Sequence, residues 1–148
     1  MDFGLRRLGL ALSDATGLLA RPWQTVPAGT DAASSAAALA DRLARGDEAA
    51  REVGAIVVGL PRRLGGEDTT LTAEARVFAR ELQARTGLDV HLQDERLTSH
   101  EAEARLAEHE PDWRARKRRI DAAAAAIILQ DYLDARPRTP RGEGTLDR

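Results

Sequence analysis

The sequence predicts a three-layer α/β domain in which a mixed sheet lies between helices. The first observation is a strand-like pattern at the start of the chain, followed by alternating helix-like and strand-like segments. The second is the run VGAIVVGLP at 53–61, which is apolar until it closes on Gly-Leu-Pro. Such a run is typical of a strand that is buried on both faces of a partly parallel sheet.

The first third of the chain contains a hairpin, a further strand and a helix. Residues 7–13 (RLGLALS) are strand-like, and Gly4–Arg6 is a plausible turn joining them to the residues before. Residues 24–27 form a third short strand in this interpretation. The alanine-rich segment 31–45 has apolar residues at helical spacing, and Gly46 ends it.

The rest of the chain alternates between helices and a strand. Residues 70–85 are helical, with Gly87 as the C-terminal stop. The segment LDVHLQD at 88–94 alternates as a strand does. A capping-box pattern begins a helix that covers 98–110, and the last helix covers 120–135.

Length and composition indicate one domain over residues 1–135 and a flexible tail over 136–148. The chain has no cysteine, which excludes a disulfide framework and thiolate metal sites. The longest apolar run, at 122–129, is far shorter than the roughly 20 residues that span a bilayer. We therefore expect a soluble, cytoplasmic protein. The net charge of −2 attracts no nucleic acid by itself, so any such attraction must be local.

Two acidic residues stand where packing alone would not place them. Asp2 lies on the expected first strand, although aspartate is depleted in strands. The alternative for Asp2 is a solvated residue near the N-terminus. Glu95 follows the strand 88–94, and ligands of open α/β sheets bind beyond the carboxyl ends of strands. The alternatives there are a loop glutamate paired with Arg96, or Asp94 as the functional acid.

Asp121 is the third acidic residue of this kind. On a helix it shares a stripe with Ala125, Ile128 and Tyr132, so that its carboxylate points toward the core. A buried carboxylate is costly unless it has a partner. The alternative is an acid in the first helical turn, which the helix dipole favours by ~0.3–1 kcal/mol. That alternative does not explain its place on an apolar face.

Together the three acids predict a metal centre. Carboxylates that are brought close together repel one another unless a cation lies between them. Oxygen ligands indicate a hard cation, Mg²⁺ or Mn²⁺. Two such ions can stabilise the attacking and leaving oxygens of phosphodiester cleavage. The three histidines are expected at the surface: His91, His100 and His109.

Two basic segments are candidates for binding phosphate groups. The first stands just before the expected last helix, where the helix dipole disfavours cations. It consists of Arg114, Arg116, Lys117, Arg118 and Arg119. The second is PRRLGGEDT at 61–69, with Arg62 and Arg63. Solvated surface charge is the alternative for both. No aromatic residues interleave with these charges, so we expect recognition of backbone and shape rather than base sequence.

Four segments, in order, resemble a known family. They are DFGLRRLGLALSD, VVGLPRRLGG, DERLTSHEAEARL and KRRIDAAAAAIILQDYL. They are similar to the pre-16S rRNA nucleases, also called Holliday-junction resolvases, of the ribonuclease H-like superfamily. The likeness runs from Asp2 to about Leu133.

The resemblance implies a ribonuclease H-like fold with a five-stranded central sheet, and metal-dependent cleavage of nucleic acid. By motif position the family's catalytic, metal-binding acids fall on Asp2, Glu95 and Asp121. It implies maturation of the 5′ end of 16S rRNA, with precursor ribosomal particles as possible partners, or resolution of branched DNA by a monomer or homodimer.

One departure from the family concerns the first strand. Family members usually carry several apolar residues before the first aspartate, whereas only Met1 precedes it here. We therefore expect Asp2 to fray and to hold metal loosely, or the true start to lie upstream.

Two other classes of function are alternatives to a nuclease. One is a non-catalytic module that binds nucleic acid or assists ribosome assembly, for which the shortened first strand argues. The other is a fragment of a sugar-kinase or actin-like ATPase, which would need a second domain that 148 residues cannot supply.

Overall fold

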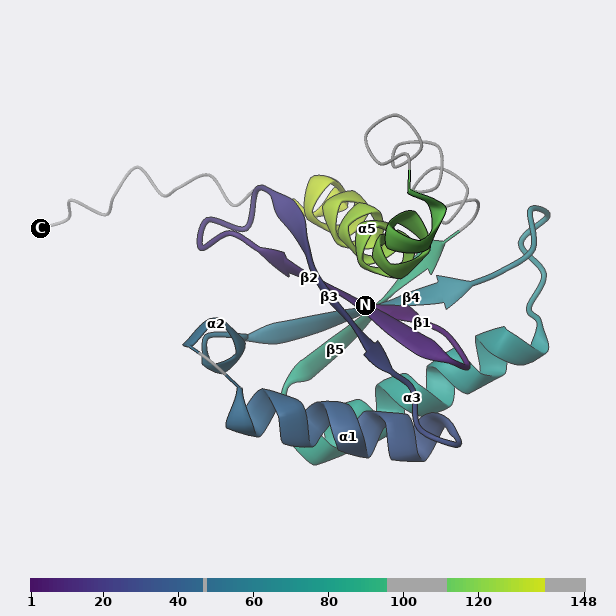
Figure 1. Cartoon of the computed structure of the whole chain (residues 1–148), viewed down its shortest axis with the longest axis horizontal. Coiled ribbons are helices and arrows are strands. Elements are labelled where there is room, and N and C mark those ends of the chain that lie inside the picture. The colour runs from purple at the N-terminus through teal and green to yellow at the C-terminus, as the bar shows by residue number, and fades with distance from the viewer. Residues whose placement is uncertain (47, 96–111, 138–148) are drawn as a thin grey trace, which may run out of the picture.

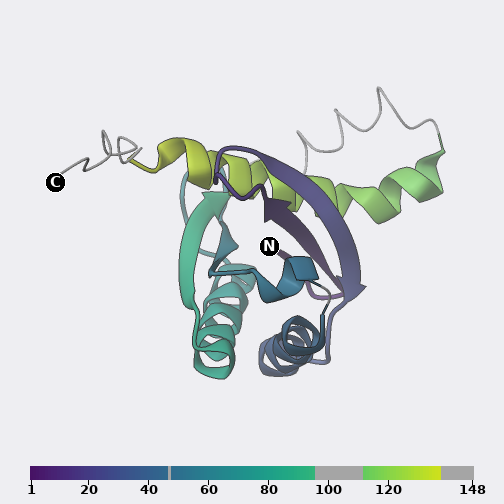
Figure 2. The same ribbon diagram turned by 90° about the vertical axis from the view of Figure 1, so that its left-hand side faces the viewer.

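The computed structural model describes residues 1–46, 48–95 and 112–137, with the backbone alone at 48–49 and 113–118. Helix α5 covers one face of the strands, and α1 and α3 cover the other (Figures 1 and 2). The elements are β1 (Asp2–Phe3), β2 (Arg7–Ser13), β3 (Ala20–Pro27), α1 (Ala32–Arg45), α2 (Glu48–Arg51), β4 (Ala55–Pro61), α3 (Thr70–Thr86), β5 (Asp89–Glu95) and α5 (Trp113–Ala135). The predicted α/β class with three layers is confirmed.

The strands form two hydrogen-bonded groups that meet at Met1. Strands β1, β2 and β3 are antiparallel, and β4 pairs with β5 in parallel. The Met1 amine donates to the Val57 carbonyl at 2.6 Å, and the Gly59 N–H donates to the Met1 carbonyl at 2.9 Å. These two bonds place β1 beside β4 near the middle of the strands, where Figure 1 marks the N-terminus. The sheet is therefore mixed, as predicted, although its five strands are not one continuous ladder.

Local signals in the sequence explain where the helices begin and end. Asp31 caps α1 by accepting a hydrogen bond from the Ser34 N–H, and the Ser34 hydroxyl accepts from the Asp31 N–H. Thr69 and Thr72 form the same reciprocal pair at the start of α3. Gly87 ends α3 with a φ of 71°, a left-handed conformation that glycine adopts without strain.

The main core lies between the strands and the helices α1 and α3. Phe3 of β1 packs against Phe78 of α3, with ring centroids 4.9 Å apart. Strand β4 is buried from Ile56 to Leu60, which confirms the interpretation of the apolar run. On the other face, α5 contributes small and branched residues, of which Ala125 and Ile128 are fully buried.

Two glycines allow α5 to lie close to the strands. A Cβ at Gly9 would stand 1.9 Å from the backbone carbonyl oxygen of Asp121. A Cβ at Gly59 would stand 2.7 Å from a methyl group of Ile128. At Gly9 the obstacle is the backbone of α5, so any side chain there would push the helix away from β2. At Gly59 the obstacles are the ends of the Ile128 and Glu95 side chains, which would have to move aside.

Several predicted boundaries need correction. Strand β3 begins at Ala20 rather than at residue 24, and α2 was not predicted. Helix α5 begins at Trp113 rather than at residue 120. The prediction followed the apolar stripe, but arginine and lysine are themselves good helix formers. The predicted helix at 98–110 and nearly all of the tail lie outside the described residues. No helix in the described ranges is long and apolar enough to span a bilayer.

Candidate active site

Asp2 is buried within the sheet. It pairs with Gly9 across β1 and β2, and its residue surface is only 9% exposed. Two hydrogen bonds between Met1 and β4, one donated by each, hold the other side of β1. The expectation that Asp2 frays, and the alternative that it is solvated, are therefore wrong for this structure. The short strand stays in place because Met1 continues its pairing and Phe3 anchors it in the core.

Asp121 lies directly over the strand that carries the partner of Asp2. Its backbone carbonyl contacts Gly9, and Gly9 is paired with Asp2. The predicted stripe is confirmed for Ala125 and Ile128, which are fully buried, whereas the Asp121 side chain at its start is 23% exposed. Asp121 stands two turns into α5, so the alternative of a first-turn acid is wrong. The meeting of Asp2 and Asp121 thus depends on a glycine between them.

Glu95 is the last residue of β5 and turns toward the same place. Its Oε2 is buried with no hydrogen-bond partner, and it would lie 2.5 Å from a Cβ at Gly59. The Gly59 N–H is bonded to Met1, so this carboxylate lies close to the start of β1. The neighbouring Asp94 faces Arg62, whose Nη1 is 3.6 Å from its Oδ2. Glu95, not Asp94, therefore belongs with Asp2.

Burial and mutual repulsion shift the pKa values of these groups. Burial, followed by the charge of Asp121, raises the pKa of Asp2 to about 7. Burial, followed by the charge of Asp2, raises the pKa of Glu95 to about 8. Burial lowers the pKa of the Met1 amine to about 6, although both carboxylates oppose this shift. Without a bound cation, the site therefore retains protons near neutral pH.

Arg7 is a member of the site that the sequence analysis missed. Its Nε donates to Oδ2 of Asp121 at 2.8 Å, and the two side chains are 43% and 23% exposed. Arg7 is two residues from Gly9 on β2, so both lie on the face that α5 covers. This spacing of two was a signal in the sequence that Arg7 faces α5. It does not show that Asp121 is the partner of Arg7.

The donor set fits a hard cation, although the acids are not yet gathered around one point. Within the described ranges, no three His, Cys, Asp or Glu side chains are placed to share a metal ion. Asp2 interacts electrostatically with both Asp121 and Glu95, and Glu95 keeps a buried oxygen unpaired. Mg²⁺ and Mn²⁺ prefer carboxylate oxygens of this kind. The Asp121 carboxylate is meanwhile paired with Arg7, so it faces a cation that the protein itself supplies.

In the basic loop after β4, one of the two arginines already has acidic neighbours. Arg62 lies between Asp68 and Asp94, with its Nε 3.1 Å from Asp68 Oδ1 but not aligned for a hydrogen bond. The Arg63 N–H donates to the Glu67 carbonyl at 3.0 Å, which closes the loop. The Arg63 side chain is exposed. Of the two arginines, Arg63 is thus the more accessible to a phosphate group.

The second basic cluster lies inside a helix rather than before one. Residues 114–119 form part of the first two turns of α5, which corrects the expected position. Of the cluster, only the Arg119 side chain is described, and it is exposed. Arg119 and Trp23 line a cavity of about 340 Å³ between α5 and β3. Arg119 lies two residues from Asp121 on α5, and side chains so spaced on a helix do not face each other, so Arg119 borders this cavity rather than the Asp121 carboxylate.

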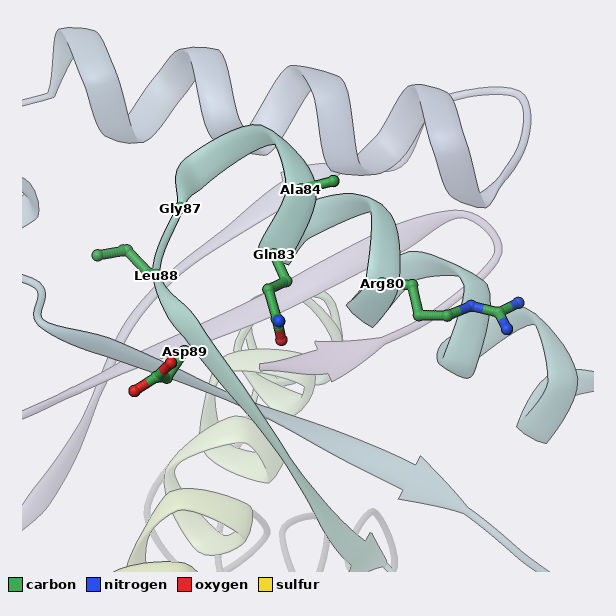
Figure 3. A pocket seen from close by; sticks show the side chains of 6 residues that line it. All are labelled: Arg80, Gln83, Ala84, Gly87, Leu88 and Asp89. Carbon is green, nitrogen blue, oxygen red and sulfur yellow. The ribbon is translucent and has the colours of Figure 1, made fainter.

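A second cavity lies away from the acids. It has a volume of about 380 Å³ and is lined by residues at the end of α3 and the start of β5. Figure 3 shows the side chains of Arg80 and Asp89 pointing apart there. Asp89 opens β5 and Glu95 ends it, so this cavity is at the opposite end of the strand from the acidic site.

The sequence of this chain is similar to those of several named proteins. Relatives from Anaeromyxobacter sp. (strain Fw109-5), Koribacter versatilis and Maridesulfovibrio salexigens are 44%, 40% and 41% identical to this chain. The alignments cover 92%, 92% and 90% of this chain and 95%, 85% and 94% of the relatives. Each relative is named "Putative pre-16S rRNA nuclease". Residues 1–135 match the RuvX Holliday junction resolvase family, and the chain therefore belongs to that family.

Proposed function

We propose that this protein is a nuclease that hydrolyses phosphodiester bonds with Mg²⁺ or Mn²⁺ held by Asp2, Glu95 and Asp121. The observation that carries the proposal is the position of Asp2. This buried carboxylate interacts with both other acids, which come from β5 and α5. Three carboxylates from distant parts of the sequence are costly to bring together unless they bind a cation.

Each group has a distinct task in this proposal. A pair of bound ions would supply Lewis-acid stabilisation of the attacking and leaving oxygens. Asp2 is the fixed ligand, because the sheet holds it on both sides. Glu95 has a buried free oxygen, which can orient a water molecule or complete the coordination. The exposed Arg63 and Arg119, with Arg62, Arg114, Arg116, Lys117 and Arg118, would attract and hold the phosphate backbone.

For the substrate we propose the precursor of 16S rRNA, cut at its 5′ end, or branched DNA such as a Holliday junction. The names of the relatives support the first, and the family description supports the second. Precursor ribosomal particles would then be partners, and we place the activity in the cytoplasm, where such particles assemble. A homodimer would suit the two-fold symmetry of a four-way junction, whereas RNA trimming needs only a monomer.

Cleavage of both substrates tests the proposal directly. A 5′-extended 16S precursor RNA and a four-way DNA junction would be incubated with Mg²⁺, with Mn²⁺ and with EDTA. We expect cleavage only with metal, and its loss in Glu95→Gln. Glu52→Gln is the matched control, because Glu52 is exposed and far along the chain from the acids. Cleavage by Glu95→Gln at the wild-type rate would refute the assignment of this carboxylate.

A non-catalytic binding module remains the second candidate. It is favoured by the ion pair between Arg7 and Asp121, which occupies one of the three acids. Such a module would bind RNA equally well with Mg²⁺ and with EDTA, and would cut neither substrate. A longer version of the chain, extended before Met1, should be assayed in parallel, so that activity of the extended form alone can be recognised.

A further inference from the structure

Arg7 is placed to compete with a metal ion. Its Nε is 2.8 Å from Asp121 Oδ2, so it takes an oxygen that a cation would need. The contact uses one of the five N–H donors of the guanidinium, and the side chain is 43% exposed. An exposed ion pair of this kind is weak and can be exchanged for a stronger one.

The same position brings Arg7 near any phosphate group that is cut at this site. The scissile phosphate must lie beside the carboxylates that hold the metal, and Asp121 is one of them in the proposed function. Once it leaves Asp121, the Arg7 side chain still projects from β2 next to that carboxylate. A guanidinium binds phosphate oxygens through two parallel N–H donors, a geometry that lysine cannot reproduce.

We propose that Arg7 is an internal counter-cation that neutralises Asp121 in the metal-free protein and becomes a phosphate-binding residue when metal takes its place. The inference rests on the proposed function, because it requires a metal ion at Asp121. It assigns Arg7 two successive partners, of which the first is present in the structure.

A purely structural explanation is that the Arg7–Asp121 ion pair only stabilises the packing of α5 on β2. That contact is already fixed by the close approach of the Asp121 carbonyl to Gly9 and by the buried stripe of α5. This structural explanation predicts that Arg7→Gln lowers the free energy of unfolding and leaves the metal affinity unchanged. An internal counter-cation predicts that metal binds more tightly, since a competitor and a like charge are both removed.

Calorimetric titration with Mn²⁺ separates these explanations. The proteins are wild type, Arg7→Gln, Asp121→Asn and the control Arg6→Gln, which removes the same charge from the adjacent, exposed residue. We expect Arg7→Gln to bind Mn²⁺ about fivefold more tightly than wild type, and Arg6→Gln to bind as wild type does. Asp121→Asn should bind much more weakly.

The failures can be told apart. If the wild type and Arg7→Gln both fail to bind Mn²⁺, the metal centre itself is wrong, and the inference falls with it. If the wild type binds Mn²⁺ but Arg7→Gln binds no more tightly, the metal centre stands and the inference alone is overturned. An equal gain in Arg6→Gln would reduce the effect to general charge and would also overturn the inference.

Two further measurements follow the released side chain. The Arg7 Nε–H resonance, identified by its absence in Arg7→Gln, should lose its protection from solvent exchange as Mg²⁺ is added. Binding of a labelled four-way DNA junction in Ca²⁺ should show a salt dependence that is lower by about one phosphate contact in Arg7→Gln. Arg7→Lys should restore that salt dependence, because it keeps the charge, but should not restore the full affinity, because lysine lacks the bidentate geometry. A resonance unchanged by Mg²⁺, at metal concentrations that saturate the calorimetric signal, would refute the release of Arg7.

Discussion

The free energy of unfolding of the metal-free protein should fall as pH rises from about 4.5 to about 6. The pKa of Asp2 rises from 3.8 to about 7 on folding, and that of Glu95 rises from 4.5 to about 8. In this pH range the folded state keeps both protons, whereas the unfolded state releases them. A carboxyl group with a raised pKa therefore stabilises the folded state at low pH, and that contribution is lost as pH increases.

The magnitude follows from proton linkage. Each proton that only the folded state retains changes the free energy of unfolding by about 1.4 kcal/mol per pH unit. Two such protons give a loss of about 4 kcal/mol between pH 4.5 and 6, which is an upper bound because the two groups interact. In Glu95→Gln only the proton of Asp2 remains, so the slope should be about half that of the wild type.

Other groups with shifted pKa values act mainly outside this interval. The Met1 amine has its pKa lowered from 8.0 to about 6, so it acts with the opposite sign and reduces the loss of stability only near the top of the interval. Hydrogen bonds lower the pKa values of Asp14 and Asp31 below 3.8, so their stabilising contributions are complete before the interval begins. The difference in slope between the wild type and Glu95→Gln therefore measures the contribution of the Glu95 proton.

Urea unfolding in EDTA, followed by circular dichroism at pH 4.5, 5, 5.5 and 6, measures the effect. Glu52→Gln is the control for an exposed glutamate and should keep the wild-type slope. Equal slopes in the wild type and Glu95→Gln would refute the claim that the burial of Glu95 near Asp2 raises its pKa. A slope of the opposite sign in the wild type would refute the whole electrostatic picture of the site.

Three further predictions concern packing, the metal and the hairpin. Gly9→Ala should lower the free energy of unfolding, measured in urea, by about 3 kcal/mol, because the added Cβ meets the Asp121 carbonyl. Gly54→Ala is the control and should change this free energy little, because the space around Gly54 is open. Mn²⁺ should raise the melting temperature of the wild type but not of Asp2→Asn, and a rise in both would place the ion elsewhere. Gln130→Ala removes hydrogen bonds of 2.9 Å to the Ala20 N–H and the Leu18 carbonyl, so it should lower the free energy of unfolding in urea by about 2 kcal/mol. An unchanged free energy would refute the claim that Gln130 anchors the β2–β3 hairpin to α5.

Local features of the fold could be predicted from the sequence because their causes are local. Asp31 begins a helix through its side chain, and Gly87 ends one through its backbone conformation. The apolar run of β4 by itself indicates a buried strand. The start of α5 was predicted too late, since an arginine-rich segment can be helical without an apolar stripe. The partners of that helix, which decide whether it forms, are far away in the sequence.

The candidate site was predictable as a set of residues but not as an arrangement. Asp121 could be identified because an acid on an apolar stripe needs an explanation. The orientation of Glu95 rather than Asp94 depends on the register of β5 beside β4, which no short pattern fixes. The contribution of Met1 and the partner of Arg7 are contacts across more than fifty positions, and only the folded chain brings them together.

The way Met1 joins the two groups of strands has a consequence for synthesis of the protein. Strand β1 is made first, but β4, which holds Met1, and the elements that carry Glu95 and Asp121 are made later. A growing chain on the ribosome thus contains Asp2 long before the other acids exist. In the proposed function it cannot cut RNA until α5 has emerged and closed over Gly9. The metal site of the proposed function is therefore complete only after α5, the last helix that the structure describes, has been made.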